Sequence, residues 1–398
     1  MHTKILIGKT FTPSAPIDSK ALFAGRTNQI STLINTVTQR GQHAVLFGER
    51  GVGKTSLANI LKGLMSGHKF AVASTNCEVA SDFQSIWKNI FKGFLVSTKE
   101  TGMGLVPVEH RSFSTFADQL PPNSTAEDVR HLLEKFEVPS IILIDEIDRI
   151  SDQQTLTSIA DTIKTLSDHS VNTTLILVGV ADSLDSLIRE HQSIERALVQ
   201  IQMPRMKLGE LRELISKGLD VLGMTMDDAV SSRICRLSNG LPHYTHSLAL
   251  HSCQAAVDRG SLAVTQVDLI TAVNVSISQA QQSIVRSYQQ ATSSPRGVLY
   301  PEVLLACALA KTDELGYFPT KDIRAPLTKL MGKAYDIPAF SKHLNDFCEV
   351  DRGMVLQRIG YPRRYLFRFV NPLMEPFVIM KGLSRGKITA EDIDSIND

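Results

Sequence analysis

The sequence predicts an α/β domain built on a parallel sheet, then an all-helical domain, then a smaller domain of helices and one hairpin. Three observations support this division. Short apolar runs alternate with helix-like stretches up to Met206, a pattern typical of a parallel sheet with helices on both faces. From residue 207 to residue 290 the spacing is helical only. After residue 298, three helix-like stretches precede two strand-like runs.

Composition narrows the class of protein. The 398 residues are 43% hydrophobic and 21% charged, as in an ordinary globular protein of two or three domains. The net charge of +1 creates no global field for nucleic acid or anionic membrane. Five scattered cysteines without a Cys-x-x-Cys pair argue against disulfides and zinc, and favour a reducing compartment. No signal-peptide or membrane-spanning run is present, so we expect a cytoplasmic protein with no membrane partner.

The first domain contains five expected strands separated by helical stretches. The strands are His43–Gly48, Phe70–Cys77, Ser140–Asp145, Thr173–Val180 and Ala197–Met206. Helical spacing covers Arg26–Arg40, Lys54–Met65, Ser81–Leu95, Ser124–Phe136 and Ser151–Ser167. Residues 97–123, rich in Gly, Pro, Ser and Thr, are expected to form a long loop or insertion.

The rest of the chain predicts two further domains and a tail. Helices are expected at Leu208–Val221, Asp227–Leu237, Pro242–Asp258 and Gln266–Gln290, and then near Pro301–Ala310, Thr320–Gly332 and Ile337–Phe347. The runs "MVLQRI" and "YLFRFV" complete the pattern of a winged helix. The expected boundaries are an irregular N-terminal arm (1–20), the α/β domain (21–206), the helical domain (207–290), the winged helix (298–383) and a flexible acidic tail (384–398).

A glycine-rich loop carries the strongest chemical signal. "GERGVGKTS" fits the pattern G-x-x-x-x-G-K-[ST] and lies between an expected strand and an expected helix, as a phosphate-binding loop requires. Its backbone N–H groups and the helix N-terminus favour phosphate. Lys54 is expected to reach the β- and γ-phosphates, and Thr55 to bind Mg²⁺. We therefore expect ATP or ADP with Mg²⁺, held by Gly48, Glu49, Arg50, Gly51, Val52, Gly53, Lys54, Thr55 and Ser56.

The strand "IILIDEID" supplies the acidic partner of this loop. Asp145 follows four apolar residues at the carboxyl end of the strand, where it would hold Mg²⁺ through water. Glu146 is placed to orient or deprotonate an attacking water, so the pair predicts ATP hydrolysis with Lys54 and Glu146 as catalytic residues. Asp148 could act at the site or only cap and pair.

The order of phosphate loop, "DE" strand, helical domain and winged helix resembles the AAA+ superfamily. Within it, the chain is most similar to replication-initiator ATPases and to the related STAND signalling ATPases. "LFAGRTNQI" resembles the stretch that opens such modules, which implies that Gly25 and Arg26 lie near the adenine. The resemblance implies an α/β P-loop NTPase (AAA+ parallel sheet) with an all-α helical lid and a C-terminal winged helix.

The resemblance also implies two further site residues. A polar residue after the fourth strand senses the γ-phosphate in the family, which points to Asp182 or Ser183. A carboxylate beside phosphate is unfavourable, so Asp182 could equally be a loop acid. An arginine before the fifth strand reaches a neighbouring subunit's nucleotide, and Arg196, or else Arg189, stands there. The alternative for Arg196 is a solvated surface residue.

The lid stretch "SNGLPHYTH" departs from the common AAA+ pattern. Many members place an arginine three residues after the glycine, where this chain has His243, a weaker phosphate ligand. Gly240-x-Pro242 instead resembles the Gly-x-Pro of STAND ATPases, which implies that Pro242 packs near the adenine. A purely structural alternative is a proline in the first turn of a helix after a glycine that ends the previous one.

These features favour a regulatory switch ATPase that hydrolyses ATP slowly and forms a homo-oligomer with ATP. STAND proteins carry effector or sensor modules for which these 398 residues leave no room. We therefore expect a separately encoded effector, with bacterial antiviral (anti-phage) defence as one setting. The alternative is an initiator- or transposition-type ATPase that binds DNA through hairpin residues Arg358, Arg363, Arg364 and Arg368. A metabolic kinase with the same loop would leave the lid and winged helix unexplained.

Overall fold

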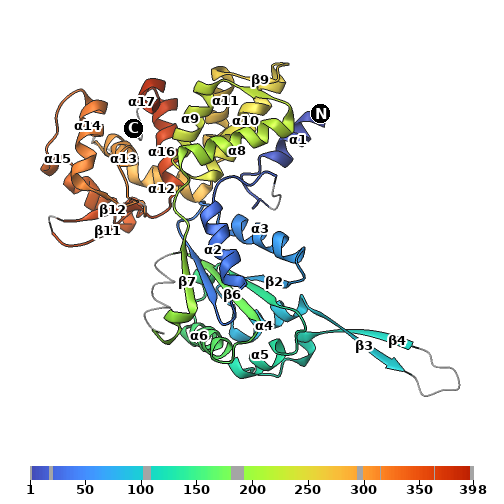
Figure 1. Cartoon of the computed structure of the whole chain (residues 1–398). Coiled ribbons are helices and arrows are strands. Elements are labelled where there is room, and N and C mark those ends of the chain that lie inside the picture. The colour runs from blue at the N-terminus through green and yellow to red at the C-terminus, as the bar shows by residue number, and fades with distance from the viewer. Residues whose placement is uncertain are drawn as a thin grey trace. The chain divides into compact units, whose positions relative to one another are not determined.

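The computed structural model describes residues 2–17, 21–101, 109–180, 192–293, 299–313, 315–362 and 364–394. The chain divides into two compact units (Figure 1). One unit, here the sheet unit, comprises residues 26–48 and 54–203. The other, here the helical unit, comprises residues 1–25, 49–53 and 204–398. In this division the expected lid and winged helix share one unit, and the boundaries expected between them stay a prediction.

The sheet unit is built on a five-stranded parallel sheet with the order β2-β5-β6-β1-β7. All five strands were expected from their apolar runs. The central strands β1, β5 and β6 are buried along nearly their whole length, whereas the edge strands β2 and β7 are partly exposed. They are β1 (His43–Phe47), β2 (Ala71–Asn76), β5 (Ser140–Asp145), β6 (Thr173–Gly179) and β7 (Leu198–Gln202).

Helices cover both faces of this sheet. Strand residues such as Val45, Ile142 and Leu177 belong to a core cluster with α4, α5 and α6. The alternate residues, such as Leu46 and Ile176, are equally buried on the other face, where α2 and α3 contact the strands. The helices of this unit are α2 (Thr27–Val37), α3 (Lys54–Ser66), α4 (Phe83–Lys92), α5 (Ala126–Leu133) and α6 (Gln153–Asp168), with short 3-10 turns η1 (Phe116–Gln119), η2 (Ile147–Arg149) and η3 (Gln192–Ala197).

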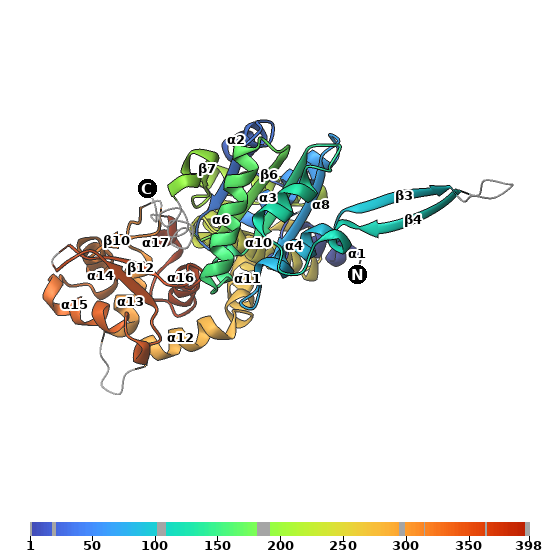
Figure 2. The ribbon, with the colours of Figure 1, turned by 90° about the horizontal axis from the view of Figure 1, so that it is seen from below.

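The segment expected as a long loop contains a two-stranded ribbon instead. Strand β3 (Leu95–Thr101) pairs with β4 (Glu109–Thr115) in antiparallel register, and η1 follows directly (Figure 2). Backbone N–H and C=O groups need partners, and antiparallel pairing supplies them without a hydrophobic pattern in the sequence. Of the two alternatives, the loop was therefore wrong for these two strands, and an insertion stays a prediction.

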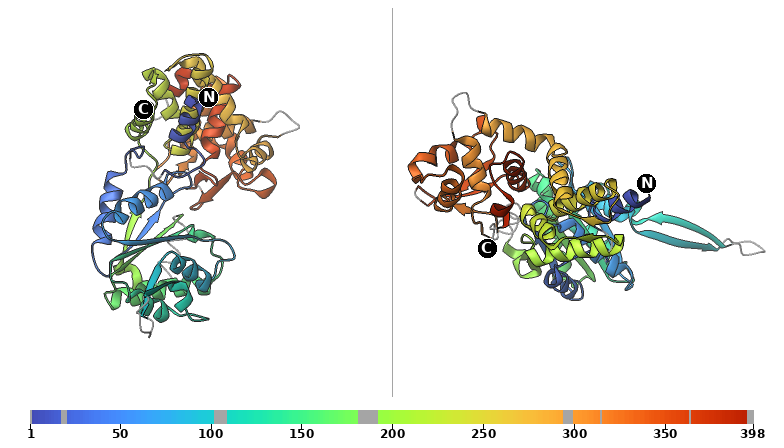
Figure 3. Two further views of the ribbon diagram at one scale, coloured as in Figure 1. Left: turned by 90° about the vertical axis from the view of Figure 1, so that its right-hand side faces the viewer. Right: turned by 90° about the horizontal axis from the view of Figure 1, so that it is seen from above.

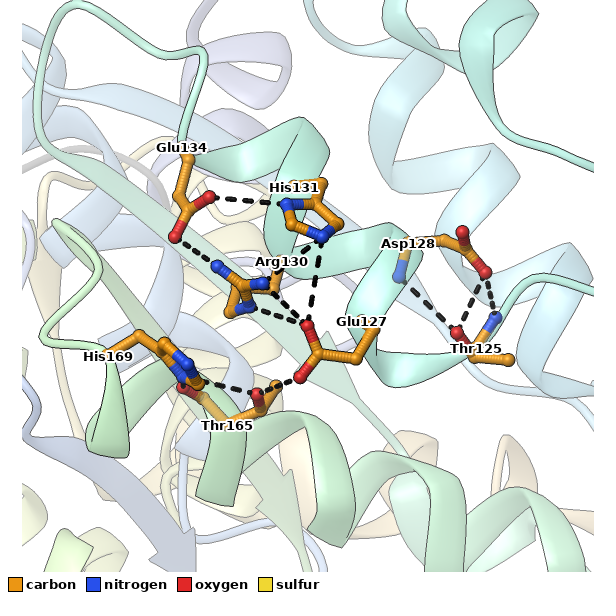
Figure 4. A network of polar contacts seen from close by, with 8 residues as sticks. All are labelled: Thr125, Glu127, Asp128, Arg130, His131, Glu134, Thr165 and His169. Atoms are coloured by element: carbon orange, nitrogen blue, oxygen red, sulfur yellow. Dashed lines mark hydrogen bonds and ion pairs between the residues drawn. The ribbon is translucent and has the colours of Figure 1, made fainter.

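A polar network joins α5 to α6 within the sheet unit (Figure 4). Thr125 caps α5, and its side chain and that of Asp128 bond reciprocally in a capping box. Glu127 accepts hydrogen bonds from Arg130 of its own helix (2.8 Å) and from Thr165 of α6 (2.8 Å). These contacts lie at the helix surface, so they fix the orientation of α5 more than they add stability.

The lid portion of the helical unit contains four consecutive helices and the N-terminal helix α1 (His2–Thr10). The lid elements are α8 (Leu208–Leu222), β8 (Thr225–Met226), α9 (Asp228–Ser238), α10 (Pro242–Asp258), β9 (Ala263–Val264) and α11 (Gln266–Ser278). Helix α1, blue in Figure 3, contacts α8 and α10, so the expectation of an irregular arm was wrong for His2–Thr10. Helix α11 ends at Ser278 and α12 (Gln282–Thr292) starts after a turn, where one helix was expected, because α11 packs on α10 and α12 on α13.

The C-terminal elements follow the order expected of a winged helix. They are α13 (Tyr300–Ala308), β10 (Phe318–Pro319), η4 (Thr320–Ile323), α14 (Arg324–Met331), α15 (Ile337–Asp346), η5 (Val350–Arg352), β11 (Leu356–Ile359) and β12 (Leu366–Phe369). Strands β10, β12 and β11 form one antiparallel sheet.

Two helices after this sheet were not expected. Helix α16 (Met374–Ser384) is buried almost all round, including Phe377 and Met380, so it shows no amphipathic period. Helix α17 (Ala390–Asp394) lies within the stretch expected to be a flexible tail. It is anchored by buried Ile393 and by an ion pair between Asp394 and Arg233 (3.0 Å). No helix among the described residues has the length and apolar character needed to cross a membrane.

Candidate nucleotide site

The phosphate-binding loop joins β1 to α3, as the motif requires. Gly53 has a positive φ of 94°, which favours glycine there. A side chain at Gly48 would place its Cβ atom 2.3 Å from the backbone oxygen of Met203, so only glycine fits. The local geometry therefore favours glycine at both positions, and the backbone between them can turn around a phosphate.

Lys54 and Thr55 begin α3 and lie in the sheet unit with Asp145. The Lys54 Nζ atom donates a hydrogen bond to the backbone oxygen of Gly48 (2.9 Å), across its own loop. The Thr55 Oγ1 atom donates to Asp145 Oδ2 (2.7 Å), although 90 residues separate them in the chain. The predicted lysine, hydroxyl and carboxylate are thus assembled by the sheet, since β1 and β5 both end at this edge.

The donor set of Thr55 and Asp145 fits a magnesium ion. A hydroxyl and a carboxylate are the hard oxygen ligands that Mg²⁺ prefers. Burial raises the pKa of Asp145, and the hydrogen bond from Thr55 opposes that shift. When bound with nucleotide, the ion would offset charge on the phosphate oxygens. A nearby cation would also remove the cost of keeping Asp145 ionised in a buried position.

Glu146 has a backbone conformation that is uncommon for a residue other than glycine. Its φ of 55° and ψ of 37° lie in the left-handed region. Its N–H donates to Asp145 Oδ1 (2.8 Å), and its carboxylate accepts from Arg149 (3.0 Å). Such backbone outliers cluster at functional sites. The neighbouring Asp148 accepts from the N–H of Val180 (3.3 Å), and its role at the site stays a prediction.

Two other site residues predicted in the sheet unit, Arg196 and Arg26, differ in exposure. Arg196 is 81% exposed and pairs with Asp168 (3.1 Å), beside an open hollow that Lys164 and Glu195 also line. Arg26 is buried at the N-cap of α2 with a positive φ. The sensor candidates Asp182 and Ser183, and the alternative Arg189, lie outside the described residues.

The loop segment Glu49–Gly53 belongs to the helical unit, where the lid stretch contacts it. Pro242, in the first turn of α10, has its Cγ atom 4.0 Å from the position that a Cβ would take at Gly53. The Cβ atom of His243 is equally far from the corresponding position at Gly51. The two predicted lid residues therefore lie beside the phosphate loop, although the adenine contact of Pro242 stays a prediction.

His243 is held by the N-terminal segment. Its Nδ1 atom lies 2.7 Å from the backbone oxygen of Pro13, so the ring donates a hydrogen bond from Nδ1. Burial lowers the pKa of His243, which keeps the ring neutral at physiological pH. A neutral ring already bonded through Nδ1 cannot supply the charge or the two-pronged contact of an arginine. Gly25, which was predicted to lie near the adenine, belongs to the helical unit, and its backbone N–H donates to Glu213 of α8 (3.2 Å).

Sequence reasoning missed an ion network around Glu49. The Glu49 carboxylate accepts from Arg205 (2.7 Å), and Arg205 also pairs with Glu375 of α16 (2.8 Å). Asn239 donates to the other oxygen of Glu375 (2.6 Å). We call Glu49, Arg205 and Glu375 the latch. An acid inside the apolar run "NPLMEPFVIM" was the available signal, because a buried charge requires a partner.

The latch is deeply buried. Side-chain exposure is 8% for Glu49, 13% for Arg205 and 2% for Glu375. Burial works against the charge of Arg205, yet Glu375 and Glu49 together raise its pKa. Burial raises the pKa of Glu375, and Arg205 opposes that shift. Two carboxylates therefore share one arginine, so losing Arg205 would leave two buried acids without this cation.

Gly240 makes room for the latch. A Cβ at this position would lie 2.6 Å from the Cβ atom of Arg205. Its φ is positive (76°), and its backbone oxygen accepts from the N–H of Met206 (2.8 Å). The stretch "SNGLPH" thus contributes to the latch through Asn239, to the loop through Pro242 and to the N-terminal segment through His243.

Comparison with known proteins places this site in a family. Residues 15–299 match the family model described as Novel STAND NTPase 1. A search of curated proteins gave no match.

Solved structures show a similar fold at low sequence identity. A Walker-type ATPase of Pyrococcus abyssi has a TM-score of 0.51 at 14% identity, covering 92% of this chain and 98% of that one. The ORC1 protein of Aeropyrum pernix, solved in complex with DNA, has a TM-score of 0.50 at 14% identity, covering 95% and 96%. The family match spans most of the chain and includes the whole phosphate loop, and the similar structures extend the likeness to the C-terminal elements. The chain therefore belongs to the Novel STAND NTPase 1 family and is a P-loop ATPase with the AAA+ fold.

Proposed function

We propose that this ATPase is a nucleotide-dependent switch that forms a homo-oligomer with ATP and controls a partner protein. The observation that carries the proposal is the latch. It ties the phosphate loop, through Glu49, to the start of the lid, through Arg205, and to the C-terminal helix α16, through Glu375. A change of the loop on binding nucleotide would therefore alter a buried network that reaches both the lid and the C-terminal elements.

Two of the proposed catalytic side chains have partners within the protein. Lys54 bonds to the backbone of its own loop, and the Glu146 carboxylate bonds to Arg149. Both side chains would have to exchange these partners to act on a phosphate or on water. A switch that hydrolyses ATP slowly suits that arrangement, because the active arrangement then forms only when a trigger supplies the free energy.

Oligomer formation rests on Arg196 in this proposal. The side chain is 81% exposed, and its ion pair with Asp168 is a surface one, which contributes little stability. Arg196 could therefore leave Asp168 and reach the nucleotide of a neighbouring copy at little cost. We assign the output of the switch to a separately encoded effector, and bacterial antiviral defence is the setting that we propose for it.

The test uses Glu375→Gln, which keeps the hydrogen-bonding shape but removes one latch charge. We expect faster release of ADP from this variant, measured with a fluorescent ADP analogue, and oligomers at a lower ATP concentration in size-exclusion chromatography. Glu349→Gln, an exposed acid of the same unit, is the matched control. Wild-type protein that stays monomeric with ATP, or unchanged ADP release in Glu375→Gln, would contradict the switch.

The second candidate is a DNA-binding initiator-type ATPase, which the exposed wing residues Tyr361 and Arg364 favour. Other predicted contacts are engaged within the protein. Arg358 bonds to Asn345 (2.6 Å), and Arg368 stacks on the ring of Tyr317 (4.6 Å). Arg363 lies outside the described residues.

Helix α15 adds little support to this candidate, because His343 is buried there against Tyr300. Filter binding of duplex DNA at several salt concentrations, with and without ATP, decides between the candidates. Binding that weakens steeply with salt and depends on Arg364 would favour DNA. Absence of binding at low salt removes this candidate.

A further inference from the structure

A hollow in the helical unit gathers three cations away from the phosphate loop. It encloses about 30 Å³ between α12, α13, α14 and α16. Lys381, Arg385 and Lys387 line it, and Glu302 is the acid among the lining residues. The residues that line the hollow therefore carry a formal net charge of +2.

The pairing of these cations leaves two of them without an acid. Lys387 pairs with Glu302 (3.2 Å). Arg385 donates to the hydroxyl of Tyr288 (3.3 Å), a neutral partner. Lys381 lies near the ring of Phe377 (5.9 Å) and makes no ion pair within the described parts of the chain. Lys381 and Arg385 stand four residues apart at the end of α16, on one helix face, where like charges repel.

The end of a helix attracts cations by itself, which accounts for one cation in the last turn. It does not account for Lys387, which lies beyond the helix yet lines the same hollow. Nor does it account for the buried hydroxyl of Tyr288, whose oxygen accepts from Arg385 and for whose own hydrogen no acceptor is found among the described residues. Burial raises the pKa of Tyr288, so that hydrogen is retained.

We propose that this hollow binds the phosphate group of a small phosphate monoester. An excess of two positive charges matches a phosphate monoester, which carries close to two negative charges at neutral pH. Arg385, Lys381 and the Tyr288 hydroxyl would donate hydrogen bonds to its oxygens. The hollow has room for about two waters, so it would admit part of the phosphate group, with the ester substituent at the open side. Pro301 and Leu330 provide an apolar wall for that substituent.

The test measures binding by isothermal titration calorimetry with protein saturated with ADP and Mg²⁺, so that the phosphate loop does not compete for the probe. The probes are inorganic phosphate and glycerol 3-phosphate, with chloride at equal ionic strength as the blank. We expect both probes to bind, with the ester tighter, and Arg385→Gln to weaken both by about tenfold or more. If inorganic phosphate binds in an Arg385-dependent way and glycerol 3-phosphate does not, the hollow is an anion site and the proposed ester ligand is wrong.

Lys381→Met separates a ligand site from a structural role. We expect its thermal midpoint in chloride to equal or exceed that of the wild type, because a like-charge repulsion is removed, while the rise caused by glycerol 3-phosphate is lost. Lys342→Met, an exposed lysine on α15, is the matched control and should keep that rise. Three results would overturn the proposal. The first is that neither probe binds, and the second is that binding is unchanged in the Lys381→Met, Arg385→Gln double variant. The third result is Arg385-dependent binding of duplex DNA without binding of either probe.

Discussion

Three side chains predicted to act at the nucleotide site have partners within the protein. Lys54 bonds to Gly48, Thr55 to Asp145, and Glu146 to Arg149. Each partner satisfies a charge or hydrogen-bonding group that would otherwise lose free energy. The partners also fix the positions of these side chains, so we expect nucleotide binding to exchange existing contacts.

Glu146 is the residue whose change separates binding from hydrolysis. For Glu146→Gln we expect ATP hydrolysis to fall by about 10²- to 10⁴-fold, because the amide cannot take a proton from water. Nucleotide affinity should be retained, because Lys54 and Thr55 are unchanged. Phosphate-release kinetics and equilibrium binding measure the two quantities. Glu78→Gln, an exposed acid of the same unit, should behave like the wild type. A Glu146→Gln variant that hydrolyses ATP at the wild-type rate would exclude the assigned role.

Two buried histidines make stability depend on pH. Burial lowers the pKa of His43 in β1 and of His246 in α10 to about 4. An unfolded histidine titrates near 6.5. The unfolded chain therefore binds more protons between these values, and stability present above pH 6.5 is lost as pH falls toward 4. Each histidine contributes on the order of 3 kcal/mol to that loss.

Urea unfolding at pH 7 and pH 5 tests this dependence. His246→Gln should lose less stability between the two pH values than the wild type, because glutamine does not titrate. His131→Gln, with a 62% exposed side chain, is the matched control and should keep the wild-type dependence. Equal losses for the wild type and His246→Gln would show that His246 is not the group responsible.

At the scale of elements, α1 acts as part of the lid. Ile7 and Phe11 are buried, and the Phe11 ring fills the space over Gly218 of α8, where a Cβ would lie 2.3 Å from it. Phe11 also meets the ring of His246 edge to face (6.0 Å). The chain then continues to Pro13, which bonds to His243. The N-terminal segment therefore contacts both the lid helices and His243, one of the lid residues beside the phosphate loop.

Truncating the Phe11 side chain tests the contribution of this packing to stability. Phe11→Ala should destabilise the helical unit by about 3–5 kcal/mol, because it opens a cavity against α8 and α10. Ile5→Ala, at a position 51% exposed in the helix that precedes Phe11, should change stability by less than about 0.5 kcal/mol. Chemical unfolding followed by far-UV circular dichroism measures both. If the two variants were equally stable, α1 would contribute no packing of this kind.

For the whole molecule, nucleotide binding should appear as added stability. ADP at a hundred times its dissociation constant should raise the unfolding free energy by about 2.7 kcal/mol. Lys54→Ala should lose that gain at the same ADP concentration, because the phosphates lose a charged donor. Lys62→Ala, on the same helix but bonded to Ser74, should keep it. Differential scanning calorimetry with and without ADP gives the comparison. A full gain retained in Lys54→Ala would contradict the assigned site.

The pattern of residues was enough for local features with strong rules of their own. The five strands, the phosphate loop and the acidic end of β5 each follow from short-range requirements of burial, backbone freedom and charge. Prediction failed where those requirements depend on distant partners. Helix α16 was missed because burial all round removes its amphipathic period, and the β3–β4 ribbon because backbone pairing leaves no clear hydrophobic signal.

The sequence by itself predicted the type of site: a lysine and a hydroxyl at the start of a helix and two acids at the end of a strand, in the order typical of a P-loop NTPase. Only the tertiary structure decided what the lid stretch does. Pro242 lies beside Gly53 and His243 bonds to Pro13, while Asn239 and Gly240 support a buried latch that joins Glu49 to Glu375. The physical reason is that a charge buried among residues 49, 205 and 375 is compensated across the fold, and no spacing along the chain records which arginine meets which acid.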